Sequence, residues 1–371
     1  MRPGEGTARA YPWPVARRAQ DGDRPIFVVG TMRSGTTLMR LVLDSHENIA
    51  IAPETGLMRV VQANRYVPFW MWGDEWFTRL GVGEDEFDRA LAEFYGGFLR
   101  RYAEEQGKLR WGEKTPFHSW HLDTMARLWP DAVFVATVRH PGANVGSLVS
   151  KWHMPFERAI HRWKTINAEL VAQAGLLGDR ILFCRYEELV LEAEETLKEL
   201  LDKLGEPWSE KVLQHDVVHE ERGTADVVEG RTRSRDAIDR TRVSAWTEHI
   251  DGSSLRQLRG ETEAMGHFFG YSFDDPNALE PLVAGRRIVS GPELAARCAE
   301  FPDVPEIHRR PTRPAIERAL DPNDVVLRLR RPGERRRIRR RRRKRSAKAT
   351  LLAGNGSGIV ASIKRRLARV Y

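Results

Sequence analysis

The chain has 371 residues, of which 41% are hydrophobic, so it is long enough to form one large domain or two ordinary ones with a substantial core. Its formal net charge of +8 is unevenly placed. Residues 328–371 hold 18 Lys and Arg and one acid, Glu334, a net of +17, which leaves 42 basic and 51 acidic residues, a net of −9, in residues 1–327. The basic charge therefore belongs to the tail, and the organised part of the chain is acidic.

Cysteine usage and hydropathy indicate the compartment. Cys184 and Cys298 lie in different segments without partner spacing, which argues against a disulfide framework or a thiolate metal site and fits a reduced cytoplasm. No apolar h-region follows the N-terminus, and no run of about 18 apolar residues occurs, so neither a signal peptide nor a membrane span is expected. We expect a cytoplasmic protein, soluble or at most peripheral to a membrane, with no disulfide partner.

Four segments are expected along the chain. They are a loose leader at 1–24, an organised domain at 25–285, a C-terminal extension at 286–327 and a flexible, arginine-rich tail at 328–371. The tail is expected to be flexible because its arginines repel one another and cannot bury a core.

The organised domain begins with a strand, a tight turn and a helix. Residues 26–29 form an apolar run typical of a strand buried on both faces, which ends in the glycine-bearing turn 30–35. Apolar residues then recur at helical spacing from Leu38 onward. This succession is the first half of a βαβ unit.

The same alternation returns further along the chain. A short strand is predicted at 49–51, longer ones at 132–138 and 181–184, and helical segments at 57–110, 143–152, 155–178 and 187–204. Alternating strands and helices favour an α/β fold of three layers, in which a central, mainly parallel sheet is flanked by helices.

Residues 30–37 have the composition of a phosphate-binding loop. A glycine-bearing turn between a strand and a helix offers backbone N–H groups and the positive helix end to an anion. The spacing Gly30-x-x-x-x-Gly35-Thr36-Thr37 matches the NTP-binding loop, except that Thr36 replaces the lysine that reaches the β and γ phosphates. The positive charge here is Arg33, inside the loop. The loop therefore predicts phosphate binding but argues against ordinary ATP or GTP hydrolysis.

The strand 132–138 differs from an ATPase strand in a second way. An ATPase usually places a magnesium-binding aspartate at the end of a neighbouring strand, but this strand ends in Arg139. The site is therefore expected to hold negative charge with arginines instead of a metal, which suits a nucleotide that carries an extra phosphate.

Several short motifs between residues 25 and 275 point to one family. They are Arg33-Ser34-Gly35-Thr36-Thr37-Leu38-Met39-Arg40, Leu43-Asp44-x-His46, Glu54-Thr55, Lys114-x-Pro116-Phe117, Val138-Arg139 with Ser147, Tyr186-Glu187-x-Leu189-Val190 and Ser244-x-Trp246-Thr247. In these motifs the sequence resembles the sulfotransferases that depend on PAPS (3′-phosphoadenosine 5′-phosphosulfate), most of all their tyrosylprotein sulfotransferase branch. The resemblance implies a P-loop-like fold and transfer of a sulfuryl group from PAPS to a hydroxyl, with PAP as product and no metal required.

The resemblance also implies which residues bind the donor. The loop residues Ser34, Gly35, Thr36 and Thr37, together with Arg33, are expected at the 5′-phosphosulfate. The other expected donor contacts are Arg139 and Ser147 at the 3′-phosphate and Tyr186 at the nucleotide. The planar fork of an arginine matches the geometry of a phosphate.

One donor-binding segment departs from the family. Ala245 precedes Trp246, where the family has a lysine. The loop 229–243 carries a hydroxyl at Ser234 and five arginines, any of which could replace the missing lysine: Arg231, Arg233, Arg235, Arg240 and Arg242. Ser234 and Arg242 are the donor contacts we assign in this loop, although which arginine serves stays open.

The chemistry needs cations and a base. Charge grows on the leaving and peripheral oxygens during transfer, and by resemblance Arg33 and Lys114 meet those oxygens, with Lys114 predicted in the turn 112–116. The acceptor hydroxyl must give its proton to a group about 3 Å away. Glu54 matches the carboxylate base of the tyrosylprotein branch; its rivals are His46, His118 and His121.

Two other functions stay open at this stage. A metal-dependent nucleotide or small-molecule kinase would need a loop lysine and a magnesium aspartate. An adaptor could bind a polyanion or an anionic membrane through the tail 328–371. The acceptor is equally open among a small metabolite, a lipid, a saccharide and a tyrosine, because the segments expected to shape its pocket, 57–110 and 155–178, do not resemble the tyrosine branch clearly.

Overall fold

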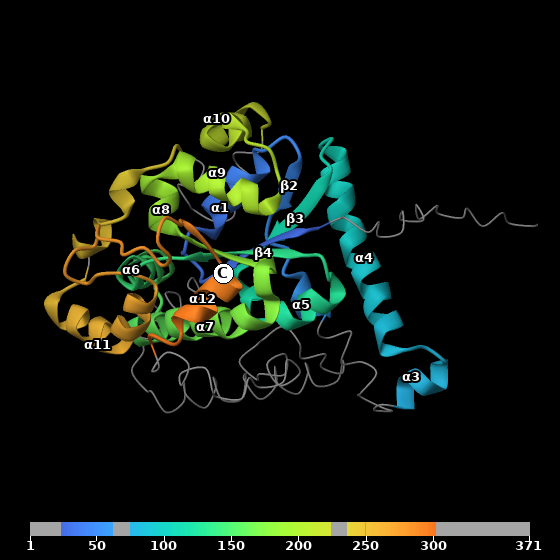
Figure 1. Ribbon diagram of the computed structural model, residues 1–371, viewed down its shortest axis with the longest axis horizontal. Coiled ribbons are helices and arrows are strands. Elements are labelled where there is room, and N and C mark those ends of the chain that lie inside the picture. Colours follow the sequence, from blue (N-terminus) through green and yellow to red (C-terminus); the bar gives the residue numbers. More distant parts are fainter. Residues whose placement is uncertain (1–23, 62–74, 224–235, 249, 302–371) are drawn as a thin grey trace, which may run out of the picture. The chain divides into compact units, whose positions relative to one another are not determined.

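The computed structural model describes residues 24–61, 75–223, 236–248 and 250–301 (Figure 1). The chain divides into two compact units, Met1–Arg318 and Ala319–Tyr371, and every described residue belongs to the first. Several predictions therefore concern residues outside the described ranges: the loose leader up to residue 23, the C-terminal extension from residue 302 onward, the flexible tail 328–371, and the donor contacts offered by Arg231, Arg233, Ser234 and Arg235.

A single sheet organises the described part of the chain. Its strand order is β2-β3-β1-β4-β5-β6. The bounds are Ile26–Gly30 (β1), Ile49–Ala52 (β2), Arg110–Lys114 (β3), Val133–Val138 (β4), Ile181–Arg185 (β5) and Ile288–Ser290 (β6). Neighbours from β2 to β5 pair in parallel, and β6 pairs antiparallel with β5. The predicted α/β fold with a mainly parallel sheet is confirmed.

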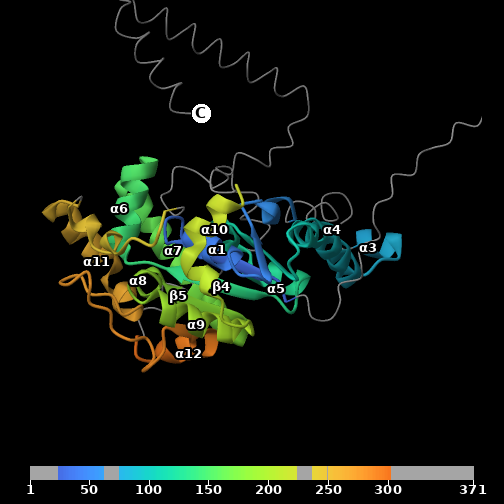
Figure 2. The same ribbon diagram turned by 90° about the horizontal axis from the view of Figure 1, so that it is seen from above.

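Helices cover both faces of the sheet, which gives three layers (Figures 1 and 2). One face carries α1 (Thr36–Asp44), α8 (Tyr186–Leu191), α9 (Ala193–Leu204) and α10 (His215–Glu221). The other carries α4 (Glu84–Glu105), α5 (Leu122–Leu128), α6 (Pro141–Trp152), α7 (Phe156–Leu177), α11 (Gly252–Phe268) and α12 (Gly291–Arg297), with the short α3 (Glu75–Leu80) preceding α4. In the described ranges, no helix combines the length and the apolar character needed to cross a membrane.

Alternate residues of each strand fill two separate cores. In β1, Phe27 and Val29 belong to the core shared with α4, α5 and α7, whereas Ile26 and Val28 belong to the core shared with α1, α8 and α9. A parallel sheet buried on both faces leaves its polar side chains to the strand ends. The carboxyl ends of these strands are therefore where a site can form.

The prediction of a turn at 112–116 was wrong, because residues up to Lys114 form strand β3. The strand has no apolar run, yet all five residues are buried. Its charges are paired: Arg110 lies 3.1 Å from Glu206, and Lys114 lies 2.6 Å from Glu54. Gly112 lets β3 approach β1, since a Cβ there would meet the Ile26 carbonyl oxygen at 2.1 Å.

Three other segments differ from their predicted bounds. The helix predicted at 187–204 is two helices, α8 and α9, which break at Glu192 (φ −134, ψ 52). The segment 57–110, predicted as helical, contains α3 and α4 and ends in β3. Beyond residue 285, where the predicted domain ends, β6 still pairs with β5 and α12 packs against α7.

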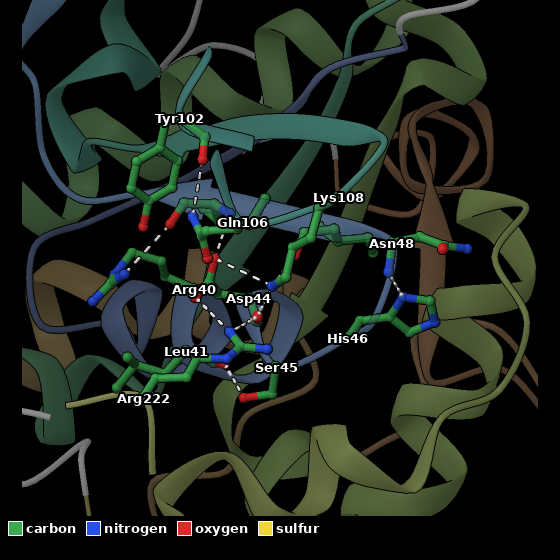
Figure 3. Close-up of polar contacts among 12 residues, drawn as sticks. Arg40, Leu41, Asp44, Ser45, His46, Asn48, Tyr102, Gln106, Lys108 and Arg222 are labelled. Carbon is green, nitrogen blue, oxygen red and sulfur yellow. Dashed lines mark hydrogen bonds and ion pairs between the residues drawn. The ribbon is translucent and has the colours of Figure 1, made fainter. Parts of the chain in front are cut away.

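Charged side chains close the outer edge of β2, among them Arg40, Asp44 and Lys108, which are drawn in Figure 3. The Ile51 N–H donates to Asp44 Oδ1 at 2.8 Å, and the Ile51 carbonyl accepts from Arg40 at 3.4 Å. The Ile49 carbonyl accepts from Lys108 Nζ at 2.7 Å. An exposed strand edge invites pairing with another chain, and these side chains occupy the groups that such pairing would use.

Candidate active site

The loop 31–35 joins β1 to α1 and is held from three sides. Within the loop, the Ser34 N–H donates to the Thr31 carbonyl at 3.0 Å. The Ser34 hydroxyl bonds the Thr137 hydroxyl of β4 at 2.8 Å, and the Gly30 N–H donates to Ser119 Oγ at 3.0 Å. These bonds fix the loop before any ligand arrives.

Two glycines let neighbouring elements close on the loop. Gly30 has φ 146, and a Cβ there would lie 2.5 Å from the Thr137 carbonyl oxygen. Gly35 has φ 98, and a Cβ there would lie 2.5 Å from the Tyr186 ring. Gly35 is also the N-cap of α1, where no side-chain bond caps the helix. The first-turn N–H groups of α1 therefore suit an anion, which the positive helix end favours.

Five predicted donor-binding residues converge beside this loop. Arg33 Nε donates to Ser147 Oγ at 3.0 Å. Arg139 donates to the carbonyls of Arg33 and Arg242, each at 3.1 Å. Its guanidinium lies 4.1 Å from the centre of the Tyr186 ring. The structure thus gathers side chains from the loop, from the ends of β4 and β5, from α6 and from the 3₁₀ turn Arg240–Arg242.

The electrostatics of this arginine cluster (Arg33, Arg139 and Arg242) favour a bound anion. Burial lowers the pKa of Arg33; Arg139 and Arg242 also lower it, while Tyr186 acts in the opposite direction. Arg139 Nε is buried and has no hydrogen-bond partner among the described residues. An anion placed here would relieve the repulsion and supply acceptors for buried donors.

A second group lies at the other side of the loop. Lys114 Nζ lies 2.6 Å from Glu54 Oε1 and 3.3 Å from Thr37 Oγ1. The Lys114 side chain is fully buried, whereas that of Glu54 is 39% exposed. The lysine is therefore held in place, and the carboxylate can be reached from solvent. Arg33 bonds Ser147 instead, so the two cations predicted to share the transferred group lie in separate hydrogen-bonded groups.

The predicted residues follow the strand order across the carboxyl edge of the sheet. From the β2 side inward, the order is Glu54 after β2, Lys114 at the end of β3, the loop after β1, Arg139 after β4 and Tyr186 after β5. One end of this row carries the candidate base, and the other carries the arginine cluster.

Two of the rival histidines are buried and engaged elsewhere. His46 bonds the Pro207 carbonyl at 2.8 Å through Nε2 and accepts from the Asn48 N–H at 3.1 Å through Nδ1. His118 is 2% exposed and lies 3.0 Å from Glu113 through Nδ1. These positions favour Glu54 over His46 and His118 as the group that meets an acceptor.

Sequence reasoning missed several residues that shape the loop. Thr137 and Ser119 bond it directly, and Asn144 Nδ2 donates to the Met32 carbonyl at 3.1 Å. Thr137 had a visible signal, because it is the one polar residue within the apolar strand 132–138. Ser119 and Asn144 lie 89 and 112 positions from their loop partners, and only the fold brings them there.

Comparison with known proteins decides the family. A family model described as "Sulfotransferase family" matches residues 25–210, half of the chain. The chain belongs to the sulfotransferase family. It is 27% identical over 271 residues to the protein-tyrosine sulfotransferase of Drosophila melanogaster, and the match covers 69% of this chain and 52% of the fly protein. It is 27% identical over 287 residues to protein-tyrosine sulfotransferase 1 of Danio rerio, and the match covers 72% of this chain and 79% of the fish protein.

A solved structure agrees at the level of the fold. The sulfotransferase domain from the Synechococcus PCC 7002 olefin synthase is 22% identical, with a TM-score of 0.51, and the match covers 67% of this chain and 94% of that domain. The family and the fold predicted from the sequence are both confirmed. The matched region spans only about half the length of the fly relative.

Proposed function

We propose that this sulfotransferase moves the sulfuryl group of PAPS onto an acceptor hydroxyl, with Glu54 as general base. The observation that carries the proposal is the contact of Lys114 with both Glu54 and Thr37, at 2.6 and 3.3 Å. Through these two contacts the buried Lys114 links the solvent-accessible Glu54 carboxylate to Thr37, in the first turn of α1, a helix without a side-chain cap. A base beside a fixed cation and an anion-binding loop is what hydroxyl attack on an activated sulfuryl group requires.

The residues present fit the donor. Ser34, Gly35, Thr36 and Thr37 would hold its 5′ end at the first turn of α1. Its 3′-phosphate and nucleotide would be held by Arg139, Ser147, Tyr186 and Arg242, whose clustered positive charge and buried Arg139 donor favour an anion. When bound, PAPS supplies a sulfuryl group activated by a mixed phosphate–sulfate anhydride.

The chain's own groups then have distinct tasks. Glu54 takes the proton of the acceptor hydroxyl, and its 39% exposure leaves room for the acceptor to approach. Lys114 orients that carboxylate through the 2.6 Å contact and offers its charge beside Thr37, where negative charge grows during transfer. Arg33 acts from the donor side, where it bonds Ser147.

The acceptor and further partners belong to the proposal as well. Two relatives are named for protein tyrosine, so a tyrosine hydroxyl is the first acceptor to test, beside small metabolites, lipids and saccharides. The charge of the tail 328–371 adds a proposed contact with an anionic membrane or another polyanion.

Transfer from ³⁵S-labelled PAPS to phenols, sugars, lipids and tyrosine peptides tests the function. We expect Glu54→Gln to lower kcat by ~100-fold or more with PAP affinity preserved, because it removes only the base. Arg139→Ala should weaken PAP binding, since a charge-assisted phosphate contact is lost.

Glu194→Gln is a matched control, because Glu194 forms an ion pair of the same 2.6 Å with Lys198 on the exposed surface of α9. It should leave transfer unchanged. Equal transfer by the parent, Glu54→Gln and Arg139→Ala would refute the site assignment. Phosphoryl transfer from ATP with a strict magnesium requirement would instead favour the kinase alternative.

A further inference from the structure

A second charged residue at the end of β3 has no task in the proposed reaction. Glu113 precedes Lys114 and is completely buried. Its Oε1 accepts from the Thr55 N–H at 2.8 Å, from the Thr55 hydroxyl at 3.0 Å and from the Thr115 hydroxyl. Burying a carboxylate costs free energy unless hydrogen-bond donors surround it. The donors around Glu113 therefore indicate which segment of the chain its carboxylate holds in place.

His118 completes the arrangement on the other carboxylate oxygen. Its Nδ1 lies 3.0 Å from Glu113 Oε2, and its Nε2 accepts from the Met58 N–H at 3.4 Å. Because Nε2 accepts, the ring proton is on Nδ1, which lies close to Glu113 Oε2 but is not aligned for a hydrogen bond with it. Burial tends to raise the pKa of Glu113, but His118, Thr115 and Thr55 outweigh it and hold this pKa below the usual value.

Together these side chains bind four consecutive backbone N–H groups. The Thr55 N–H donates to Glu113 Oε1 at 2.8 Å, and the Gly56 N–H donates to Thr115 Oγ1 at 3.3 Å. The Leu57 N–H donates to Thr55 Oγ1 at 3.2 Å, and the Met58 N–H donates to His118 Nε2 at 3.4 Å. The anchored segment 55–58 starts directly after Glu54. The candidate base therefore enters the site on a backbone whose direction is set from the end of β3.

We propose that Glu113 and His118 are positioning residues that hold the Glu54 carboxylate against Lys114. The inference rests on the proposed function of Glu54. Both side chains of the pair Glu113 and Lys114 act on the same segment: Glu113 fixes the backbone after Glu54, and Lys114 holds the carboxylate itself at 2.6 Å. Geometry matters here because a misplacement of about 1 Å at a reacting group costs ~100-fold in rate.

Conservative changes at three anchoring residues test the proposal. Glu113→Gln removes the charge, and Thr115→Val removes the hydroxyl that bonds both Glu113 and Gly56. His118→Asn keeps a donor near the Nδ1 position and removes the acceptor for Met58. We expect each variant to lower kcat by ~10-fold or more while PAP affinity and donor KM stay within about twofold, because donor binding uses other residues.

Hydrogen exchange supplies a readout that does not depend on turnover. Amides 55–58 should exchange faster in the three variants, whereas amides of β1 and β4 should keep the protection of the parent. Thr115→Ser, which restores the hydroxyl, should restore both kcat and protection. Thr165→Val is the matched control, because the Thr165 hydroxyl donates to His161 within α7, away from this segment.

The outcomes separate two failures. If the parent transfers from PAPS and the variants show parental kcat, the positioning role is wrong, whether or not amides 55–58 exchange faster. If kcat falls but protection of β1 and β4 falls with it, the role is general stability and the proposal is again overturned. If the parent itself transfers nothing from PAPS to any acceptor, the proposed function fails, and this inference fails with it.

Discussion

His140 illustrates how one buried side chain links the strand end to the helix that follows. It caps α6 by accepting from the Gly142 N–H at 3.0 Å through Nδ1, and its Nε2 donates to the Ser272 carbonyl at 3.0 Å. The ring stacks on Trp246 with centroids 4.7 Å apart. Burial lowers the pKa of His140 to about 4; the bond to Ser272 opposes this, and Arg139 adds to it. The folded protein therefore keeps this ring neutral.

The pKa of His140 differs between the folded and the unfolded chain, and this difference makes the stability of the protein depend on pH. The unfolded chain binds a proton on His140 near pH 6.5 and the folded chain only near pH 4, so the free energy of unfolding should fall as pH falls through this window. The loss should reach about 2 kcal/mol at pH 5. Urea denaturation at pH 7 and pH 5 measures it.

The control for this measurement is His140→Asn, because asparagine also caps helices but does not titrate. The variant should lose about 2 kcal/mol less than the parent between the two pH values. Equal losses in both proteins would show that His140 is not the group responsible.

At the residue scale, the motifs point to the proposed donor and catalytic side chains but not to the groups that we propose position them. Glu54, Lys114 and Arg139 lie in sequence blocks that can be read locally. The sequence predicts Glu113 in a turn and offers His118 as a rival base, and nothing nearby in the sequence connects either residue with Thr55. That connection exists only because parallel strands β2 and β3 end side by side.

Among the elements, the edge strand β2 shows how a short strand is protected. Lys108 Nζ donates to the Ile49 carbonyl at 2.7 Å and to the Asp44 carbonyl (Figure 3). Burial lowers the pKa of Lys108 to about 8; Asp44 and Glu47 oppose the shift, while Arg222 and Lys211 add to it. The lysine caps the edge from a buried position in which its charged form is less stable than in the unfolded chain.

Replacing this lysine tests the edge cap. Lys108→Met keeps the apolar stem and leaves the Ile49 carbonyl without its donor, so it should lower the free energy of unfolding at pH 9.5 by about 1–3 kcal/mol. Between about pH 8 and 10.5 the unfolded parent holds the extra proton, so the parent should gain stability relative to the variant as pH rises.

That gain should be about 2 kcal/mol between pH 7 and pH 9.5. Comparing chemical denaturation of the two proteins at both pH values removes the contribution of other titrating groups. A stability difference that does not change with pH would contradict the lowered pKa of Lys108.

The elements differ in how far the sequence predicts them. The apolar runs at 26–29, 132–138 and 181–184 gave β1, β4 and β5 because buried parallel strands are continuous in hydrophobicity. Strand β3 has the sequence Arg110-Trp111-Gly112-Glu113-Lys114, whose charges are buried only because each finds a partner from another element. Patterns of hydrophobicity cannot show such partners.

For the whole molecule, the outstanding feature is the separation of charge between residues 1–327 and the tail. Deleting 328–371 removes a net charge of +17 and leaves an acidic chain. We expect the truncated protein to bind PAP as the parent does, since all proposed donor contacts precede residue 302. Its binding to phosphatidylserine vesicles should fall steeply and lose its salt dependence.

Co-sedimentation with vesicles and calorimetry with PAP check these two expectations separately. Vesicles without anionic lipid are the control, because neither protein should bind them through charge. Loss of PAP binding on truncation would show that the tail and the nucleotide site are not separable parts.

The row of residues along the carboxyl edge of the sheet has a consequence for how acceptor choice could change. Under the proposed function, the base follows β2 and the nucleotide contacts follow β4 and β5, with the loop between them. The long connection from β2 to β3 returns to the sheet beside the base, whereas the nucleotide contacts come from other connections. Substitutions or insertions in that one crossover could therefore alter which hydroxyl is admitted while the machinery for the shared donor is inherited unchanged.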